Sequence, residues 1–209
     1  MRRIELTLFA KQPLPGQVKT RLQPHYTPEQ AAEIAAFMIS ATVELAVSGW
    51  PNDVSLQAWP DQDHALFREL AARHGIHLAP QRGTDLGERM HNALSDGIAR
   101  HRAAAILGCD VPQCRWEILD QADDWLARGQ NVLGPTEDGG YYLIGLTQAQ
   151  PGLFRDIPWG GPEVLAATLA RARTLGIEFE LLPRLRDVDT AEDLWLVAQR
   201  YEPLKRFLK

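Results

Sequence analysis

Short apolar runs alternate with helical segments along nearly the whole chain, and this alternation limits the fold more than any other feature. Strands are expected at residues 4–9, 54–59, 76–79, 103–107, 131–133, 141–146 and 177–182. Helices are expected at residues 28–47, 61–74, 88–101, 116–126, 162–175 and 191–201. Strands that alternate with helices form a mainly parallel sheet covered by helices on both faces. The sequence therefore predicts a three-layer α/β fold.

One pair of expected strands breaks the alternation. The strands at residues 131–133 and 141–146 are separated only by a short Gly-rich loop. Such a loop is too short for the crossover that joins two parallel strands, so one antiparallel strand is expected in the sheet. The pattern contains no internal repeat and no linker. We expect a single domain over residues 1–209.

Composition narrows the classes of partner. The formal net charge of −5 argues against a nucleic-acid partner, whose binding proteins carry a basic surface. We find no run of the roughly 20 apolar residues needed to cross a bilayer and no signal peptide, so a cytoplasmic location without membrane contact is expected. Cys109 and Cys114 are too few for a disulfide framework and lack further zinc ligands at suitable spacing, so reduced structural thiols are expected. The oligomeric state is left open.

The loop after the first expected strand combines glycine, proline and cations. Lys11, Lys19 and Arg21 fall within eleven positions, with Gly16 between them. Glycine lets backbone N–H groups approach a ligand closely, while Lys and Arg neutralise phosphate oxygens. A solvated basic turn would look similar, but a local positive patch in an acidic chain suits a small anion. We expect this loop, with Ala10 at the end of the strand, to bind nucleotide phosphates.

Other unusual residues follow the later strands, where ligands of open α/β sheets bind. Gly83, Asp85 and Gly87 follow the third strand and open a helix whose N-terminus favours anions. We expect them to contact the nucleotide, although Asp85 could simply cap the helix. Asp138 and Glu137 follow the fifth strand and are candidates for a general base by position alone; Asp138 could equally belong to a tight turn.

Asp110 is the strongest single candidate for chemistry. It ends an apolar strand just before a Val-Pro pair, which directs a hard oxygen ligand out of the sheet. Magnesium bound to a nucleotide takes only one or two protein carboxylates, and Asp189 or Asp187 of the last loop is the candidate second ligand. A capping role for Asp110 is disfavoured because it lies several residues before the next helix. Asp187 could instead pair with Arg184 or Arg186.

Six segments, in order, resemble a known family. They are Phe9-Ala-Lys-x-Pro-x-Pro-Gly-x-Val-Lys-Thr-Arg-Leu22, Gly83-Thr-Asp-Leu-Gly-Glu-Arg-Met90, Gly108-x-Asp-x-Pro112, Gly134-Pro-x-x-Asp-Gly-Gly-Tyr-Tyr-Leu-Ile-Gly145, Ile157-Pro-Trp159 and Asp187-Val-Asp-Thr-x-Glu-Asp-Leu194. The set resembles the bacterial radical-SAM-associated transferase family, also described as arsenosugar-biosynthesis glycosyltransferase-like. That family belongs to the nucleotide-diphospho-sugar transferase superfamily with the glycosyltransferase-A fold. A more distant likeness is to cofactor guanylyltransferases.

The resemblance implies nucleotide at the first half of the sheet and acceptor at the second half. It places phosphates on the first loop, at Lys11, Gly16, Lys19 and Arg21, and Mg²⁺ or Mn²⁺ on Asp110 and Asp189. The acceptor side would comprise Gly139, Gly140, Tyr141 and Trp159. Trp159 precedes two glycines and could close over the site or simply anchor a surface loop. Two departures from the common family form, Cys109 and the Gly160-Gly161 pair, fall on the acceptor side.

These observations predict a metal-dependent transferase with a nucleotide-activated donor. Asp110, Lys19 and Asp138 are the candidate catalytic residues. The resemblance favours glycosyl transfer from a nucleoside-diphosphate sugar to a small-molecule acceptor. Three cations near the first strand and a lone Asp-x-Pro in place of Asp-x-Asp favour the alternative, nucleotidyl transfer from a nucleoside triphosphate. A non-catalytic nucleotide-binding protein is a third alternative, against which the two candidate metal ligands argue.

Overall fold

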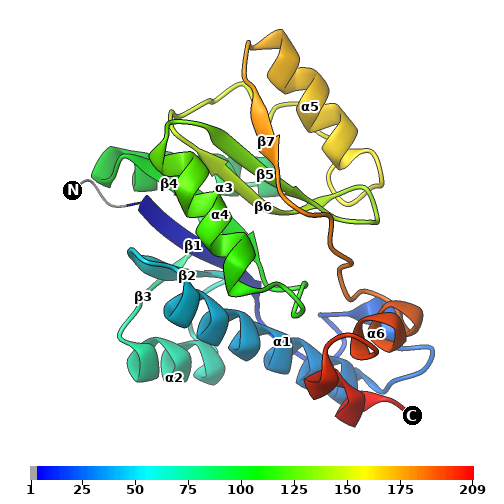
Figure 1. Cartoon of the computed structure of the whole chain (residues 1–209). Coiled ribbons are helices and arrows are strands. Elements are labelled where there is room, and N and C mark those ends of the chain that lie inside the picture. Colours follow the sequence, from blue (N-terminus) through cyan, green and yellow to red (C-terminus); the bar gives the residue numbers. More distant parts are fainter. Residues whose placement is uncertain (1–3) are drawn as a thin grey trace.

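The computed structural model describes residues 4–209, and within them seven strands form one sheet in the order β3-β2-β1-β4-β6-β5-β7 (Figure 1). The strands are β1 (Ile4–Lys11), β2 (Val54–Trp59), β3 (His77–Pro80), β4 (Ala103–Gly108), β5 (Asn131–Pro135), β6 (Tyr141–Leu146) and β7 (Phe179–Leu181). The α-helices are α1 (Pro28–Gly49), α2 (Ala65–His74), α3 (Leu86–Arg100), α4 (Trp116–Ala127), α5 (Val164–Thr174) and α6 (Ala191–Ala198). Two 3₁₀ helices are η1 (Thr20–Leu22) and η2 (Glu202–Phe207).

Strand β6 is antiparallel to both of its neighbours, β4 and β5, and the other strand pairs are parallel. The short loop between β5 and β6 imposes this reversal. It is closed by a hydrogen bond of 3.0 Å from Thr136 N to Gly140 O. The predicted α/β fold with a mainly parallel sheet and one antiparallel strand is confirmed.

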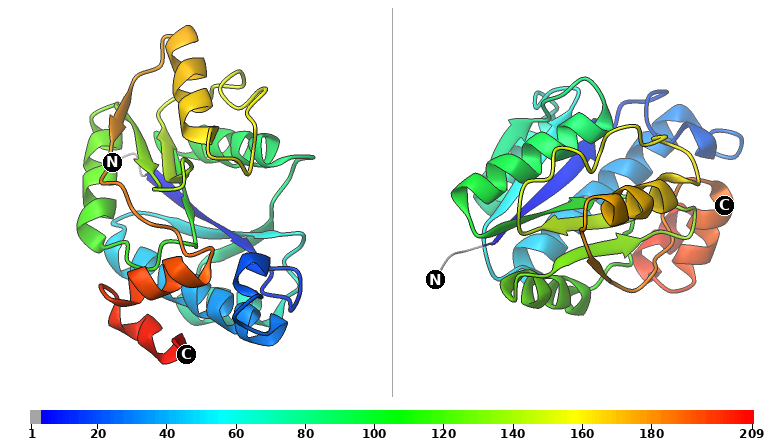
Figure 2. Two further views of the ribbon diagram at one scale, coloured as in Figure 1. Left: turned by 90° about the vertical axis from the view of Figure 1, so that its right-hand side faces the viewer. Right: turned by 90° about the horizontal axis from the view of Figure 1, so that it is seen from above.

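Helices cover both faces of the sheet, as three apolar clusters show. The first cluster packs α1, α2 and α4 against one face, with Phe67 and Leu119 fully buried. The second cluster packs α3 and α5 against the other face around Leu94 and Ile144. The third cluster joins α6 and η2 to η1 and the first half of α1. Figure 2 shows the C-terminal segment beside the start of α1.

Helix α1 corrects the expectation that no segment is long and apolar enough to cross a membrane, and the third cluster explains why. Among the described residues, α1 is the one helix that is long and apolar enough, by length and composition, to cross a membrane, contrary to the expectation that no run approaches this length. Half of its most apolar stretch is buried inside the molecule. One side of α1 packs on the sheet through Ile39 and Val43, and another side packs on α6 and η2 through Ile34 and Met38. Two buried sides account for its apolar composition.

Several element boundaries differ from prediction for local reasons. The helix expected from residue 61 begins at Ala65, because Asp61 instead accepts hydrogen bonds from Gln12 Nε2 and from the Asp63 backbone. The helix expected to end at residue 201 stops at Ala198 and is followed by η2, which was not predicted. Strand β1 runs two residues further than expected, and so its carboxyl end presents Lys11 to the loop edge of the sheet.

Candidate active site

The first loop directs its cations back toward the sheet. Gly16 adopts a φ of 77° and Lys19 a φ of 47°, both in the left-handed region. That turn at Lys19 starts η1 and points the Lys19 side chain inward, where only 5% of it is exposed. Arg21, two residues on, stays largely exposed. The loop predicted to bind phosphates therefore carries one buried and one exposed cation at the carboxyl edge of the sheet.

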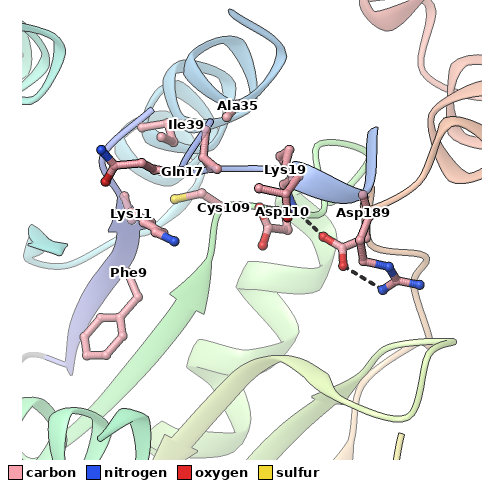
Figure 3. A pocket seen from close by; sticks show the side chains of 13 residues that line it. Phe9, Lys11, Gln17, Lys19, Ala35, Ile39, Cys109, Asp110 and Asp189 are labelled. Carbon is pink, nitrogen blue, oxygen red and sulfur yellow. Dashed lines mark hydrogen bonds and ion pairs between the residues drawn. The ribbon is translucent and has the colours of Figure 1, made fainter. Parts of the chain in front are cut away.

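Lys19 lies between two carboxylates from distant loops. Its Nζ is 2.8 Å from Asp110 Oδ1 and 3.1 Å from Asp189 Oδ1 (Figure 3). Arg21 Nη1 contacts the other oxygen of Asp189 at 2.9 Å. Burial acts to lower the pKa of Lys19, but the two carboxylates outweigh it and hold that pKa above its ordinary value. Burial likewise acts to raise the pKa of Asp189, but Lys19 and Arg21 hold it below its ordinary value.

Backbone contacts fix the spacing of the two carboxylates. Asp110 follows β4, and its carbonyl oxygen accepts a hydrogen bond of 2.9 Å from Val188 N. Gln113 Nε2 donates to Arg186 O at 2.5 Å, a second link between the β4 loop and the last loop. Asp110 and Asp189 are thus placed by two loops tied together, and the Asp110 side chain remains 57% exposed.

The two carboxylates separate two cavities. The first, of about 250 Å³, lies between the first loop and α1 and is lined by Lys11, Gln17 and Lys19 (Figure 3). The second, of about 380 Å³, is bordered by apolar side chains from β1, β4, β6, α3 and the segment before α5. Asp110 and Asp189 border both cavities. The first cavity is thus rich in cations, the second combines apolar walls with three aspartates, and the two adjoin at Asp110 and Asp189.

The residues fit a divalent ion of the kind expected. Asp110 and Asp189 direct one oxygen each to a common point that the Lys19 ammonium now occupies. Within residues 4–209, no group of three or more His, Cys, Asp or Glu side chains converges as a metal site. Two hard carboxylate ligands, completed by phosphate oxygens and water, are the donor set of magnesium and manganese in nucleotide sites.

Asp187 lies beside this pair without joining it. Burial, then the nearby charges of Asp138 and Asp189, raises the pKa of Asp187 to about 6. The pairing with Arg186 that the sequence left open does not form, because Arg186 binds Asp193 at 2.9 Å and also contacts Glu137. The geometry favours Asp189, whose oxygen reaches the Lys19 Nζ, as the partner of Asp110.

Asp138 shapes the turn between β5 and β6. Its Oδ1 accepts hydrogen bonds from the Thr136 hydroxyl at 2.5 Å and from Gly140 N at 3.0 Å. Gly139 has a φ of 93°, and a Cβ built there would lie 2.0 Å from Pro162 O. The tight turn weighed in the sequence analysis is therefore present. Asp138 also borders the second cavity, and its role as a general base stays a prediction.

The loop after β3 lies apart from the first cavity. Asp85 caps α3, since its Oδ1 accepts from Glu88 N at 2.8 Å. Asp85 and Gly87 line a separate cavity of about 640 Å³. Gly83 has a φ of 147°, and a Cβ built there would lie 2.7 Å from Arg89 N. The nucleotide-binding role of these three residues stays a prediction, and the capping alternative for Asp85 is what the structure shows.

The acceptor-side residues are brought together, along with others that the sequence analysis missed. Gly140, Tyr141 and Trp159 border the second cavity, whereas Gly139 does not, and the acceptor-side role of all four stays a prediction. Phe9 and Met90 also line it, although their apolar strand and helix segments read simply as core. Apolar wall residues have the same sequence signal as core residues, and only the fold shows which of them face a cavity.

The cysteines are free and buried, as expected. Burial raises the pKa of Cys109, which adjoins Asp110, and raises the pKa of Cys114 to about 12. A low thiolate fraction makes both thiols poor nucleophiles. The burial of Cys109 and Cys114 supports structural roles for both.

The chain is similar to solved structures over nearly its whole length. One is the crystal structure of a "putative nucleotide-diphospho-sugar transferase" from Desulfovibrio desulfuricans G20, 29% identical, covering 97% of this chain and 89% of that chain with a TM-score of 0.87. CMP:2-keto-3-deoxy-manno-octonic acid synthetase complexed with CTP is 13% identical, covers 96% and 99% of the two chains, and has a TM-score of 0.57. The Rv0371C protein of Mycobacterium tuberculosis H37Rv, in complex with manganese, is 15% identical, covers 95% and 99%, and has a TM-score of 0.57.

These likenesses agree with the expected nucleotide-diphospho-sugar transferase, or glycosyltransferase-A-like, fold. No curated protein matches the chain. Residues 42–161, more than half of the chain, match the profile of the family described as "Uncharacterized protein conserved in bacteria (DUF2064)". The chain therefore belongs to this family.

Proposed function

We propose that this protein is a metal-dependent transferase that moves a glycosyl group from a nucleoside-diphosphate sugar to a small-molecule acceptor. One observation carries the proposal. Asp110 and Asp189 direct their oxygens to a common cation position at the border of a cation-rich cavity and an apolar cavity. This is the arrangement that a transferase needs, with the donor phosphates on one side and the acceptor on the other.

The first cavity suits the donor phosphates. Lys11 and Lys19 line it, and Arg21 borders both cavities. Lysine and arginine side chains neutralise phosphate oxygens, and the left-handed Gly16 turn leaves the loop backbone open to an approaching ligand. The synthetase with the same fold is known in complex with CTP, which supports a nucleotide ligand for this protein.

Asp110 and Asp189 are the residues that would hold Mg²⁺ or Mn²⁺. When bound, the ion would act as a Lewis acid that neutralises charge on the donor phosphates. A protein of the same fold, Rv0371C, is known in complex with manganese, which supports a divalent ion here. Lys19 and Arg21 would stabilise the negative charge that grows on the leaving phosphate.

The reaction is a substitution at the sugar carbon. The acceptor oxygen forms a bond to C1 as the bond from C1 to the donor phosphate oxygen breaks. That bonding pair stays with the nucleoside diphosphate, and the acceptor proton passes to Asp138, whose carboxylate borders the acceptor cavity. The products are the glycosylated acceptor, the nucleoside diphosphate and one proton.

Nucleotidyl transfer is the second candidate, and a specific observation favours it. Three cations, Lys11, Lys19 and Arg21, border the donor side, which suits the greater charge of a triphosphate. In that reaction the acceptor attacks the α-phosphorus and pyrophosphate leaves. The resemblance to the radical-SAM-associated, arsenosugar-biosynthesis-like family favours glycosyl transfer instead, and we keep that reaction first.

A calorimetric binding panel tests the proposal. Nucleoside triphosphates and nucleoside-diphosphate sugars are titrated in turn with Mg²⁺, with Mn²⁺ and with a chelator. Metal-dependent binding of a diphosphate sugar in preference to triphosphates is the expected result. The opposite preference would favour nucleotidyl transfer, and metal-independent binding of every nucleotide would contradict the metal assignment.

The Asp110→Asn variant sharpens the test. It keeps the side-chain shape but removes one of the two charges directed to the common cation position. Metal-dependent nucleotide binding and turnover should both be lost, with the circular dichroism spectrum unchanged. Asp96→Asn is the matched control, because Asp96 lies on α3, pairs with Arg82 and borders neither cavity.

A further inference from the structure

The second cavity lies where an acceptor must bind if the proposed function is right. It borders Asp110 and Asp189 but excludes Lys11 and Lys19, which line only the first cavity. Its volume of about 380 Å³ falls within the range of small-molecule sites. The chemistry of its walls therefore describes the acceptor.

The walls of this cavity are aromatic and aliphatic. Trp159 meets Tyr141 edge to face, with ring centroids 6.4 Å apart and planes at 78°. Trp159 also stacks on Phe154, with centroids 6.5 Å apart and planes at 30°, although Phe154 does not itself line this cavity. Phe9 and Met90 complete this part of the wall. The hydroxyl of Tyr141 is buried toward Thr168, and burial raises its pKa, so the ring adds apolar area without charge.

The charges around this cavity are mostly negative. Asp110, Asp138 and Asp189 border it, and the one bordering cation among the described residues is Arg21. Arg21 is already engaged by Asp189 at 2.9 Å. A carboxylate or phosphate held against the Trp159 wall would lie near Asp138. The one bordering cation, Arg21, is engaged by Asp189 or, in the proposed reaction, by the donor phosphate, so nothing offsets the desolvation and like-charge repulsion of an anionic ligand here.

We propose that the acceptor is a small molecule that carries a hydroxyl or amino group on an apolar body and has no negative charge. The apolar body would lie against Trp159, Tyr141 and Met90, and the nucleophilic group would face Asp138. The role of this molecule as the acceptor rests on the proposed function, whereas its chemical class rests on the walls of the cavity. It also disfavours transfer to a phosphorylated acceptor.

Three probes with one shared body test the ligand class. Benzyl alcohol, benzylamine and benzyl phosphate have the same ring and differ only in charge. Each is titrated by calorimetry into the wild type, Trp159→Ala and Trp116→Ala. Trp116 is the matched control, because it is 57% exposed at the start of α4, outside the cavity.

Benzyl alcohol and benzylamine should lose about tenfold or more in affinity in Trp159→Ala and keep it in Trp116→Ala. Binding of benzyl phosphate should not depend on Trp159, because its charge directs it to the cations of the first loop. Benzyl phosphate binding that is as tight as that of the alcohol and is equally lost in Trp159→Ala would overturn the proposal. So would alcohol and amine binding that Trp159→Ala leaves unchanged.

Two milder variants keep the test decisive if Trp159→Ala does not fold. Trp159→Phe retains an aromatic wall and should preserve benzyl alcohol binding. Asp138→Asn removes the facing charge, so it should weaken the binding of benzylamine by a larger factor than that of benzyl alcohol; an equal effect on both probes would contradict the proposal. The nucleotide binding panel does not use these probes. A failure of the proposed function is therefore distinguishable from a failure of this inference.

Discussion

At the scale of single residues, Lys19 is the most informative side chain in the molecule. Its ammonium is buried between Asp110 and Asp189, in a backbone conformation that non-glycine residues seldom adopt. Breaking a buried ion pair by removing one partner costs about 3–5 kcal/mol, because the remaining charge is left uncompensated. Lys19 therefore supports the fold of the site as well as its charge, and it competes with any ion for the same two carboxylates.

This competition gives a prediction for Lys19→Met. In chelator the variant should melt at a lower temperature than the wild type, since Asp110 and Asp189 then repel each other. Mn²⁺ alone should restore the melting temperature and should bind about tenfold or more tightly than to the wild type. Nucleotide affinity should fall at low salt. Thermal unfolding and Mn²⁺ titration, both without nucleotide, measure the first two effects.

Lys11→Met is the control for this prediction. Lys11 lines the same cavity but has no ion pair with Asp110 or Asp189. Its loss should weaken nucleotide binding without changing the response to Mn²⁺. If Lys19→Met binds Mn²⁺ no better than Lys11→Met, the shared cation position is wrongly assigned.

Asp187 predicts how stability depends on pH. Its pKa is raised from 3.8 to about 6, so the folded state holds this proton more tightly than the unfolded chain. Between these values the unfolded chain loses the proton first, and stability falls as the pH rises. The full difference corresponds to about 3 kcal/mol, which solvent at this partly exposed group reduces to about 1–2 kcal/mol.

Asp187→Asn should therefore stabilise the protein above pH 6 and leave it unchanged near pH 3.5. Urea unfolding in chelator at several pH values measures the difference. Asp120→Asn, at an exposed position of α4, is the control. A stabilisation by Asp187→Asn that is equally large at low and neutral pH would contradict the titration argument.

At the scale of elements, the β5–β6 turn connects the reversed strand to the acceptor cavity. The Gly139 carbonyl accepts a hydrogen bond of 2.8 Å from Leu165 N, which ties the turn to the first turn of α5. Gly139 has a φ of 93°, and Gly160, on the neighbouring loop, has a φ of 83°. The two glycines differ only in their surroundings: a Cβ at Gly139 would clash with Pro162, whereas a Cβ at Gly160 meets open space.

This contrast predicts unequal costs for the same substitution. Gly160→Ala should cost about 1–2 kcal/mol, the strain of the left-handed backbone alone. Gly139→Ala carries the same strain and must also displace Pro162, so it should cost about 2 kcal/mol more and reduce benzyl alcohol binding. Urea denaturation of both variants gives the comparison. Equal costs would show that the Pro162 contact relaxes freely.

The elements were largely predictable because each has a local cause. Thr27 and Gln30 form the capping box that starts α1, and the short loop before Tyr141 forces β6 to reverse. The 3₁₀ helices were not predicted, because their apolar residues form no periodic pattern long enough to be recognised in the sequence. The extra length of β1 comes from pairing of Lys11 with Trp59, a contact between distant residues that no local pattern contains.

The site was predictable in its residue types and less so in its connections. Asp110, Lys19 and Asp189 stand out as charged residues in the loops that follow strands. The contact of Lys19 with Asp189, 170 positions away, depends on how the last loop returns to β4, and no spacing in the sequence encodes it. Phe9 and Met90 could not be identified as cavity residues, because the sequence pattern around an apolar side chain is the same whether it faces a cavity or the core.

At the scale of the whole molecule, the third apolar cluster supports the donor side. Leu22 and Val188 are fully buried in it, and each is the direct neighbour of a charged residue of the site, Arg21 and Asp189. Leu204 of η2 is equally buried in that cluster. The C-terminal segment therefore positions η1 and the last loop relative to each other, although its own residues do not border either cavity.

Leu204→Ala tests whether this support is specific. Truncating a buried leucine costs about 2–5 kcal/mol, and Leu70→Ala, in the first cluster under α2, should cost a similar amount. Only Leu204→Ala should also weaken nucleotide binding, by about threefold or more, when measured by calorimetry at a temperature where both variants are folded. If the two variants bind nucleotide with equal affinity, the cavity left by Leu204 changes stability without moving Asp110 or Asp189. The Lys19 ion pairs alone would then hold η1 and the last loop in place.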